Sequence, residues 1–427
     1  MSAEWMPFTE LLSKIIDNRG RTCPVGTVGL PLIATNCIDR SNLYPAYDTT
    51  RFVSDETYKT WFRGHPLPGD ILFVCKGSPG RTNWVPDPVD FCIAQDMVAV
   101  RADSSKIYPK YLFAALRSSV VQSQIDNMHV GTMIPHFKKG DFDKLRIPIL
   151  SCYAQEFIGD LYFKTSERIA LLRETNATLE AIAQALFKSW FVDFDPVRAK
   201  QEGREPEGMD AGTAALFPDS FEESELGLVP RGWKAKPLSD VLKSKIKQVG
   251  GVVVPEYSST NFGLQLRSEI FKKKLSGSIS KNKLIHQGDL VFGLSRQILN
   301  FGLMQDLVGC VSPAYKVFTV DKNMISIYLL ERIMRFHAGY FFNAISASSR
   351  EGQSISSENL GHLKFVQFPI EVQNAFHAII EPLRNRKEVI ESQTQTLASI
   401  RDTLLPRLIS GQLRLPEAEA IIGEAIA

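Results

Sequence analysis

Apolar residues recur at steps of three and four over a long stretch in the middle of the chain. The stretch contains no proline and one glycine, Gly159, and its stripe comprises Ile158, Tyr162, Thr165, Ile169, Leu172, Asn176, Leu179, Ala183, Leu186 and Trp190. Such spacing places side chains on one face of a helix. The pattern predicts a helix over Gln155–Phe191, about 55 Å long at ~1.5 Å per residue. A helix this long and one-sided needs a partner in water.

A second stretch near the end of the chain shows a matching pattern. It predicts a helix over Gln373–Ser410. Each residue of its stripe lies the same number of positions after a residue of the first stripe, and Gln373 follows Gln155 at that same separation. Any two amphipathic helices can be aligned in this way, so periodicity alone does not establish a repeat. The second stripe comprises Phe376, Ile380, Leu383, Lys387, Ile390, Thr394, Leu397, Arg401, Leu404 and Leu408.

The segments before the two long helices repeat as well. Residues 1–150 predict a short helix ending at Gly20, then strands at 31–39, 71–75 and 97–100, a helix over Tyr108–Ser118 and a strand directly before the long helix. Residues 229–370 show the same order, with Gly69-Asp70 matched by Gly288-Asp289 and other pairs at nearly the same separation. Ordered matches at a nearly constant separation indicate an internal duplication. Each half is predicted to be an α/β globule followed by a long helix.

The segment between the two halves has a different composition. Residues 196–228 are acidic, rich in Gly and Pro and without a clear period, which predicts an extended linker or an irregular surface segment. The predicted organisation is therefore a first globule (1–150), the first long helix (151–195), the linker (196–228), a second globule (229–370), the second long helix (371–415) and a tail (416–427).

Composition narrows the class of protein without naming a ligand. Apolar residues make up 44% and charged residues 22% of the 427 residues, as in ordinary globular proteins, and a net charge of +2 does not indicate nucleic acid. Six cysteines without a CxxC pair argue against a zinc site or a disulfide framework and fit a reducing cytosol. No apolar run approaches the ~20 residues of a membrane span, and the N-terminus does not resemble a signal peptide. We therefore expect a cytoplasmic protein.

Candidate chemistry lies in polar loops rather than in an enzyme motif. We find no phosphate-binding loop, dinucleotide fingerprint or nucleophile elbow, and the histidines do not cluster at metal-ligand spacing. Lys and Arg can neutralise phosphates, and Arg, Asn and Gln can pair with base edges. For any single residue a solvated loop is the better interpretation, but paired loops on duplicated globules favour DNA. The candidate DNA-binding residues are Lys76, Ser78, Arg81, Asn83, His136, Lys138, Lys139, Lys272, Lys273, Lys274, Lys281, Lys283, Arg296, Gln297, Asn300, Arg350, Gln353 and Ser354.

With both halves laid out, the chain resembles the specificity subunit of type I restriction–modification systems over nearly its whole length. Each half opens at a tryptophan (Trp5, Trp233), carries a Gly-Asp-apolar motif, and ends in Ile-Pro or Phe-Pro before a Gln-led helix. The stretches LFKSWFVDFDPVRAK (186–200) and LLPRLISGQL (404–413) resemble the ends of the two conserved regions of the family. Base-reading residues vary in this family, so the candidates above depend on loop chemistry alone.

The resemblance implies a fold of the α/β (α+β) class and a non-catalytic role. Each globule would be a target-recognition domain that reads one half of a split, asymmetric duplex DNA target. The two long helices would pack as an antiparallel coiled coil with internal pseudo-two-fold symmetry and would set the distance between the halves.

The resemblance also implies partner subunits. Two methyltransferase subunits, which bind S-adenosylmethionine, and restriction subunits, which hydrolyse ATP with Mg²⁺, would dock on this chain, which would itself hold no cofactor or metal. The aromatic end of the first helix is a candidate docking surface, and packing within the chain is an equally good interpretation of it. The candidate partner-binding residues are Trp190, Phe191, Phe194, Leu405 and Leu408.

Two other classes of protein stay open. A stand-alone DNA methyltransferase or nuclease with diverged motifs would transfer methyl groups or cleave DNA by itself; the nearest approach to a methyltransferase signature, residues 312–315 (SPAY), lacks the amide and the second proline. A coiled-coil scaffold would show no salt-dependent DNA binding.

Overall fold

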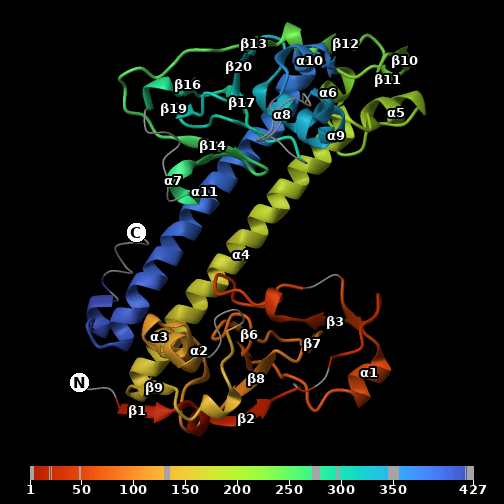
Figure 1. Ribbon diagram of the computed structural model, residues 1–427. Coiled ribbons are helices and arrows are strands. Elements are labelled where there is room, and N and C mark those ends of the chain that lie inside the picture. The colour runs from red at the N-terminus through yellow and green to blue at the C-terminus, as the bar shows by residue number, and fades with distance from the viewer. Residues whose placement is uncertain are drawn as a thin grey trace. The chain divides into compact units, whose positions relative to one another are not determined.

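The protein, seen in a computed structural model that describes residues 4–18, 20, 22–47, 50–128, 135–271, 279–294, 298–344, 355–418 and 420, consists of two compact units. The first unit is Met1–Leu179 with Arg386–Ala427, and the second is Glu180–Asn385. Two long helices, α4 (Cys152–Phe191) and α11 (Ile370–Ile409), each contribute one part to either unit (Figure 1). Each unit therefore contains one globule and two helix segments.

The first globule is built mainly on antiparallel strands. They are β1 (Glu4–Pro7), β2 (Leu12–Ile16), β3 (Leu30–Ile33), β4 (Phe52–Val53), β5 (Ile71–Val74), β6 (Thr82–Trp84), β7 (Cys92–Ile93), β8 (Met97–Ala102) and β9 (Arg146–Ile149). The main sheet has the order β2-β8-β5-β6, a smaller sheet places β3 between β4 and β7, and β1 pairs with β9. Strands β3 and β7 pair in parallel. The buried apolar runs of β5 and β8 explain why the sequence predicts both strands.

Helix α2 packs against this sheet. The helices of the first globule are α1 (Asp55–Thr60), α2 (Pro109–Arg117), α3 (Ser119–Met128) and the single turns η1 (Phe8–Leu11), η2 (Thr35–Cys37) and η3 (Lys139–Asp141). Phe73 of β5, Phe113 of α2, Tyr162 of α4 and Leu404 of α11 belong to one buried core. Gly159 lets α4 approach α2 closely, because a Cβ there would lie 2.6 Å from the backbone nitrogen of Tyr111.

The second globule repeats the sheet. Its strands are β10 (Phe221–Ser224), β11 (Gly227–Pro230), β12 (Lys234–Pro237), β13 (Leu242–Ser244), β14 (Tyr257–Thr260), β15 (Gly263–Leu266), β16 (Lys283–His286), β17 (Asp289–Phe292), β18 (Phe301–Leu303), β19 (Val308–Val311), β20 (Lys316–Val320) and β21 (Lys364–Gln367). The order β13-β20-β17-β18 reproduces β2-β8-β5-β6, and the pair β12–β21 reproduces β1–β9. This correspondence supports the predicted duplication.

The helices of the second unit include several that the sequence did not predict. They are α5 (Asp195–Gln201), α6 (Ala211–Ala215), α7 (Arg267–Ile270), α8 (Ile327–Phe336), α9 (Ala338–Phe341), α10 (Ser357–His362), and the turns η4 (Leu238–Asp240), η5 (Ile279–Lys281) and η6 (Phe342–Ala344). The expected linker 196–228 thus contains most of α5, α6 and β10. Its Phe217 is buried with its ring 5.2 Å from that of Trp190, so this segment packs on the second unit rather than extending freely.

One glutamine anchors each long helix to its globule. Gln155 accepts a hydrogen bond from the backbone nitrogen of Tyr108 (3.0 Å), before α2, and donates to the carbonyl of Leu150 (2.8 Å). Gln373 accepts from the backbone nitrogen of Ser326 (2.8 Å), before α8, and donates to the carbonyl of Phe368 (2.9 Å). All three residues of the second set follow their counterparts at the same separation along the chain, so the duplication extends to individual hydrogen bonds.

The long helices pack against each other within each unit. In the first unit Arg401 Nη1 donates to Ser166 Oγ (3.1 Å), and Asn176 Nδ2 donates to the carbonyl of Lys387 (3.4 Å). The later residue of α4 thus contacts the earlier residue of α11, which confirms that the two helices pair antiparallel. In the second unit the rings of Trp190 and Phe376 lie 5.6 Å apart.

One predicted element is wrong. The short helix expected to end at Gly20 is instead the single turn η1 followed by strand β2, which pairs with β8. The apolar residues Leu11, Leu12, Ile15 and Ile16 fit a helical face as well as a strand, and a short apolar run does not decide between them. Pairing with the buried strand β8 decides in favour of the strand.

Candidate nucleic-acid interface

The hairpin between β5 and β6 carries the first group of predicted residues. Residues 76–81, the Gly80 loop, are closed by hydrogen bonds from Gly80 N to Val74 O (3.0 Å) and from Val74 N to Arg81 O (2.9 Å). Gly80 has a φ of +80°, and a Cβ there would lie 2.9 Å from Gln122 Oε1 of α3. The loop therefore rests on α3, leaving Lys76 exposed and Ser78 and Arg81 partly exposed.

A second segment joins the Gly80 loop from a distant part of the sequence. Lys76 and His136 form an isolated antiparallel bridge, Gly77 N donates to Pro135 O (2.9 Å), and Phe137 N donates to Cys75 O (2.8 Å). Phe137 is buried, whereas Lys138 next to it is exposed. The structure thus brings Lys76, Ser78, Arg81, His136 and Lys138 together, while exposed Lys139 lies 3.5 Å from the carboxylate of Asp17.

Asn83 does not belong to this surface. Its side chain is fully buried, and its Nδ2 donates to the carbonyls of Asp39 (3.0 Å), Asn42 (2.7 Å) and Leu43 (3.3 Å). Its Oδ1 accepts from the backbone nitrogen of Asp39 (3.1 Å). Both ends of the amide are occupied, so the prediction that Asn83 reads DNA is corrected: the residue holds a neighbouring loop.

That neighbouring loop, residues 38–43, is the part of the surface that sequence reasoning missed. It follows η2, and Asp39 Oδ1 accepts from both the backbone nitrogen (2.7 Å) and the hydroxyl (2.6 Å) of Ser41. These hydrogen bonds lower the pKa of Asp39. The sequence Asp-Arg-Ser-Asn, directly after Cys37 and Ile38, is a turn signal that could have identified it. Below, these residues are called the Asp39 loop.

The Asp39 loop and the Gly80 loop line one pocket. Its volume is about 450 Å³, and Arg40 from one loop and Arg81 from the other both contribute to it. Arg40 also donates to Gln122 Oε1, and Gln122 Nε2 donates to Gly80 O (2.9 Å), so one buried glutamine connects the two loops. The lining residues are Asp39, Arg40, Gly77, Ser78, Pro79, Arg81, Asp126 and Pro135.

The predicted residues of the second globule are less concentrated. Lys281 is exposed, but Lys283 Nζ donates to Tyr315 O (2.6 Å) and burial lowers the pKa of Lys283. Asn300 donates to Leu294 O (2.8 Å). Lys283 and Asn300 therefore have structural contacts of their own. The remaining candidates, Lys272, Lys273, Lys274, Arg296, Gln297, Arg350, Gln353 and Ser354, lie outside the described residues.

The candidate partner-binding residues are buried inside the two units. The ring of Phe191 lies 4.5 Å from that of Phe368 and 4.9 Å from that of Phe376, and Phe194 packs edge-on against Trp233 at 5.8 Å. Leu405 and Leu408 belong to the core of the first unit, as Trp190 does to that of the second. Of the two interpretations open from the sequence, these contacts favour packing within the chain, because little of these side chains is left for a partner.

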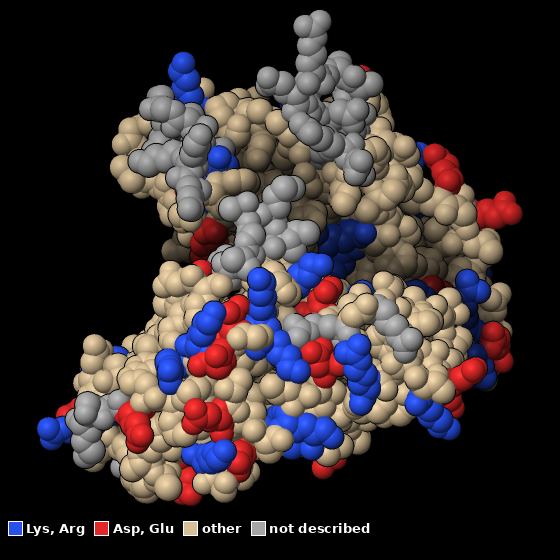
Figure 2. Space-filling model, turned by 60° about the horizontal axis from the view of Figure 1, so that its bottom comes forward, with Lys and Arg blue, Asp and Glu red and all other residues tan. Residues whose placement is uncertain are grey.

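The surface charge is mixed. On the face that Figure 2 shows, Lys and Arg side chains are interspersed with Asp and Glu. Among the residues that the structure describes, no group of three His, Cys, Asp or Glu side chains could hold a metal ion. A search of the same residues also finds no helix long and apolar enough to cross a membrane.

Known proteins similar to this chain share one description. Residues 32–181 match the family model of the type I restriction modification DNA specificity domain. The chain is 23% identical over 345 residues to the type I restriction enzyme MjaIX specificity subunit of Methanocaldococcus jannaschii, a match that covers 76% of this chain and 75% of that protein. The chain is therefore similar to the specificity subunits of type I restriction enzymes. The resemblance inferred from the sequence is thereby confirmed.

Two further similarities point to the same kind of protein. The HindI specificity subunit of Haemophilus influenzae is 29% identical over 221 residues, which is 40% of this chain and 47% of that protein. A crystal structure of the S subunit of a type I restriction-modification system from M. genitalium has the same fold, with a TM-score of 0.55 and 14% identity over 95% of this chain and 96% of that one. The family match over residues 32–181 includes the Asp39 loop, the Gly80 loop and Gln155.

Proposed function

We propose that this chain is the DNA sequence-specificity subunit of a type I restriction–modification enzyme and is not itself catalytic. Each globule reads one half of a split, asymmetric duplex target. The observation that carries the proposal is a duplicated framework with different loops: Gln155 and Gln373 make equivalent hydrogen bonds, whereas the loops of the two globules differ in sequence. Two globules of one fold with unlike loops suit two unlike half-sites, since base contacts specify the sequence.

The proposal includes the partners on which such a subunit depends. Two methyltransferase subunits, binding S-adenosylmethionine, and restriction subunits, using ATP and Mg²⁺, would supply the chemistry. The relatives support this division, because their names describe one subunit of a restriction enzyme. The buried aromatic cluster around Phe191 is not offered as the docking surface, since its rings are used within the second unit.

A domain exchange tests the proposal. The chain is co-expressed with a type I methyltransferase subunit from the same genome, and methylated sites are mapped by sequencing. Replacing residues 1–150 by the first globule of another specificity subunit should change one half of the target and leave the other half unchanged. If both halves changed, the modular interpretation would be wrong. Methylation or cleavage by the isolated chain, free of partner subunits, would favour a stand-alone enzyme instead.

A further inference from the structure

Backbone carbonyls of the Asp39 loop are hydrogen-bonded within the first unit. Each of five consecutive carbonyls, from Asp39 to Leu43, accepts a hydrogen bond from a side chain of another element. The donors are Asn83 of β6, Arg117 of α2 and Arg173 of α4. A surface loop ordinarily leaves such carbonyls to water, so this loop is held in one conformation by the groups beneath it.

Arg117 is the central donor. Its Nη2 donates to the carbonyls of Asp39 (3.3 Å), Arg40 and Asn42 (2.9 Å). Among the described residues its Nε and Nη1 are buried without a hydrogen-bond partner, and its guanidinium stands over the rings of Phe113 (4.8 Å) and Tyr162 (5.9 Å). Burial lowers the pKa of Arg117. A buried cation is costly unless polar groups surround it, so the loop carbonyls and Arg117 stabilise each other.

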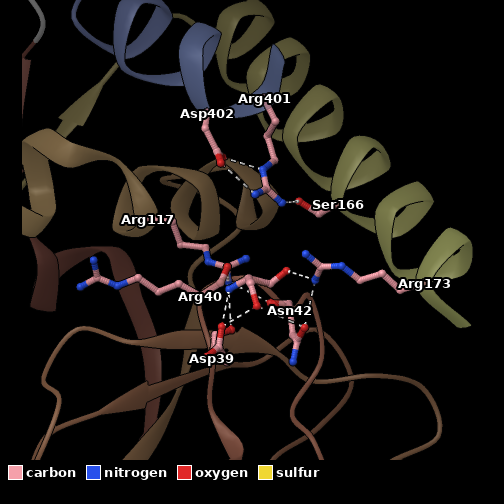
Figure 3. Close-up of polar contacts among 9 residues, drawn as sticks. Asp39, Arg40, Asn42, Arg117, Ser166, Arg173, Arg401 and Asp402 are labelled. Carbon is pink, nitrogen blue, oxygen red and sulfur yellow. Dashed lines mark hydrogen bonds and ion pairs between the residues drawn. The ribbon is translucent and has the colours of Figure 1, made fainter. Parts of the chain in front are cut away.

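The long helices take part in the same arrangement. Arg173 of α4 donates from Nη1 to Ser41 O (2.8 Å) and to Asn42 Oδ1 (3.2 Å). Arg401 of α11 stands over the ring of Tyr162 (5.4 Å), on which Arg117 also packs. Figure 3 shows Arg117 and Arg173 reaching the loop from two different helices, while the Arg40 side chain extends away from Arg173. The loop is thus positioned by α2 and α4 together.

In the Asp39 loop the side chains of Asp39, Arg40 and Ser41 are exposed, whereas those of Ile38 and Leu43 are buried. Arg40 is exposed and lines the 450 Å³ pocket with Arg81 and Ser78, and Asp39 and Asp126 line it too. A phosphate is disfavoured beside two carboxylates. Base edges in the major groove offer both acceptors, such as guanine O6 and N7, and donors, such as cytosine N4. The mixture of arginines and carboxylates therefore suits base edges better than the DNA backbone.

We propose that the Asp39 loop is a base-reading element of the first globule, with Arg40 contacting a base edge and Arg117 acting as the positioning residue beneath it. This inference depends on the proposed function, because it assigns a role within the DNA interface. It places the reading element on a segment that is anchored to α4, the long helix, and not only to the sheet.

The test is target selection from a randomised duplex library by the complex of this chain with its methyltransferase subunit. Arg40→Gln should relax the preference at one position of the first half-site by about 5- to 150-fold, the worth of one good bidentate base contact. Its salt dependence should stay close to that of the wild type. Uniform weakening across all sequences, with the salt slope reduced by about one, would make Arg40 a phosphate contact and overturn the proposal.

Arg117 is tested by a matched pair of variants. Its counterpart in the duplication is Arg335, in the last turn of α8, which pairs with Glu331 at 2.7 Å rather than holding a loop. Arg117→Gln should weaken the base preference at several positions of the first half-site and leave the preference at the second half-site intact. Arg335→Gln should leave the preference at the first half-site unchanged. Arg117→Lys, which keeps a donor for the carbonyls, should restore part of the preference. Equal effects of Arg117→Gln on both half-sites would contradict a positioning role.

Two controls keep the outcomes separate. If Arg117→Gln unfolds the first unit in circular dichroism, Arg173→Gln replaces it, because Arg173 is exposed and holds the same loop. An unchanged preference in both Arg40→Gln and Arg173→Gln would refute the inference. A wild-type complex without any sequence preference would instead refute the proposed function, so the two failures are distinguishable.

Discussion

The two units keep the same buried carboxylate but neutralise it differently. Asp70 accepts from the backbone nitrogen of Leu67 (2.8 Å) and pairs with Arg101 of β8 (2.8 Å). Asp289, at the equivalent start of β17, accepts from the backbone nitrogen of His286 (2.8 Å) but pairs with Lys245, which follows β13. A buried carboxylate must be compensated, yet the cation can come from the adjacent strand, as with Arg101 of β8, or from beside the next strand over, as with Lys245 after β13. The equivalence of the two globules is therefore recognised more reliably from the buried aspartate than from the cation that pairs with it.

The equivalent helices α2 and α8 both end near an arginine, but the two arginines make different contacts. Arg117 and Arg335 occupy matching positions, but Arg117 turns to loop carbonyls whereas Arg335 pairs with Glu331 and stands over Phe301 at 4.9 Å. The residue four positions before each arginine differs: Phe113 in α2 and Glu331 in α8. An aromatic ring there leaves the guanidinium available for the loop, while a carboxylate engages it. The side chain four positions earlier thus decides whether the arginine holds a loop, as Arg117 does, or forms an ion pair within its own helix, as Arg335 does.

The largest effect on the free energy of unfolding is expected at a core position where one unit has an aromatic residue and the other an aliphatic one. Phe191 of the second unit and Ile409 of the first are counterparts in the duplication, and both are buried. Phe191→Ala should lower the free energy of unfolding of the second unit by about 3–5 kcal/mol, and Ile409→Ala should lower that of the first by about 2–5 kcal/mol. Hydrogen exchange measured on peptides from each unit checks the assignment. A fully stable Phe191→Ala variant that loses methyltransferase binding would instead restore the docking interpretation.

The buried carboxylates should give the next largest effect. Asp70→Ala and Asp289→Ala each leave a partly buried cation without its partner, at a cost of about 3 kcal/mol. Because Arg101 lies on β8 and Lys245 follows β13, the loss of hydrogen-exchange protection should spread into β8 in the first variant and into β13 in the second. Asp141→Ala, which breaks the exposed pair with Lys144, is the control and should leave protection unchanged. Equal protection in all three variants would argue against compensation by these cations.

The anchoring glutamines should follow. Replacing either by Leu removes an acceptor for a backbone nitrogen and a donor for a carbonyl, which costs about 1 kcal/mol for each group left unsatisfied. Gln373 also donates to Met324 O (3.1 Å), so Gln373→Leu should destabilise its unit more than Gln155→Leu does. Denaturant unfolding compares the two variants directly. A larger loss for Gln155→Leu would show that the extra hydrogen bond of Gln373 contributes nothing.

The sequence predicts the long helices and the duplication well, but it does not predict the Asp39 loop. The helix expected at Gln155–Phe191 is observed at Cys152–Phe191, because a long run of positions in phase leaves little choice of structure. The role of Arg117 depends on carbonyls far earlier in the chain, at Asp39 to Asn42, and no local pattern records such a contact. The same limit explains Asn83: its residue type predicts a contact with a base edge, but its amide is hydrogen-bonded to the backbone of the Asp39 loop.

Burial at the helix end was also hidden from the sequence. Trp190 and Phe191 are more aromatic than a helix pair requires, which suggested a partner protein. The aromatic residues that cover them come from later segments, with Phe217 in the expected linker and Phe368 just before α11. A segment without periodicity gives no sign that it will fold back, so the sequence leaves a partner protein and packing within the chain equally open.

The smallest effect concerns one polar position in the helix seam of the first unit. Asn176 of α4 donates weakly to Lys387 O, and among the described residues its buried Oδ1 has no hydrogen-bond partner. The equivalent residue of α11 is Thr394, whose hydroxyl donates to Ile390 O of its own helix (2.8 Å). A polar Asn in a helix seam specifies register at a cost in stability.

Asn176→Leu should therefore raise the free energy of unfolding of the first unit by about 1 kcal/mol, since it removes an unsatisfied acceptor and adds apolar contact. Thr394→Val is the matched control and should change stability little, because the hydroxyl it removes is satisfied locally. Denaturant unfolding of the full chain, with exchange read on peptides from α4 and α11, measures both variants. A less stable Asn176→Leu variant would mean that the amide contributes more to the seam than its single long hydrogen bond suggests.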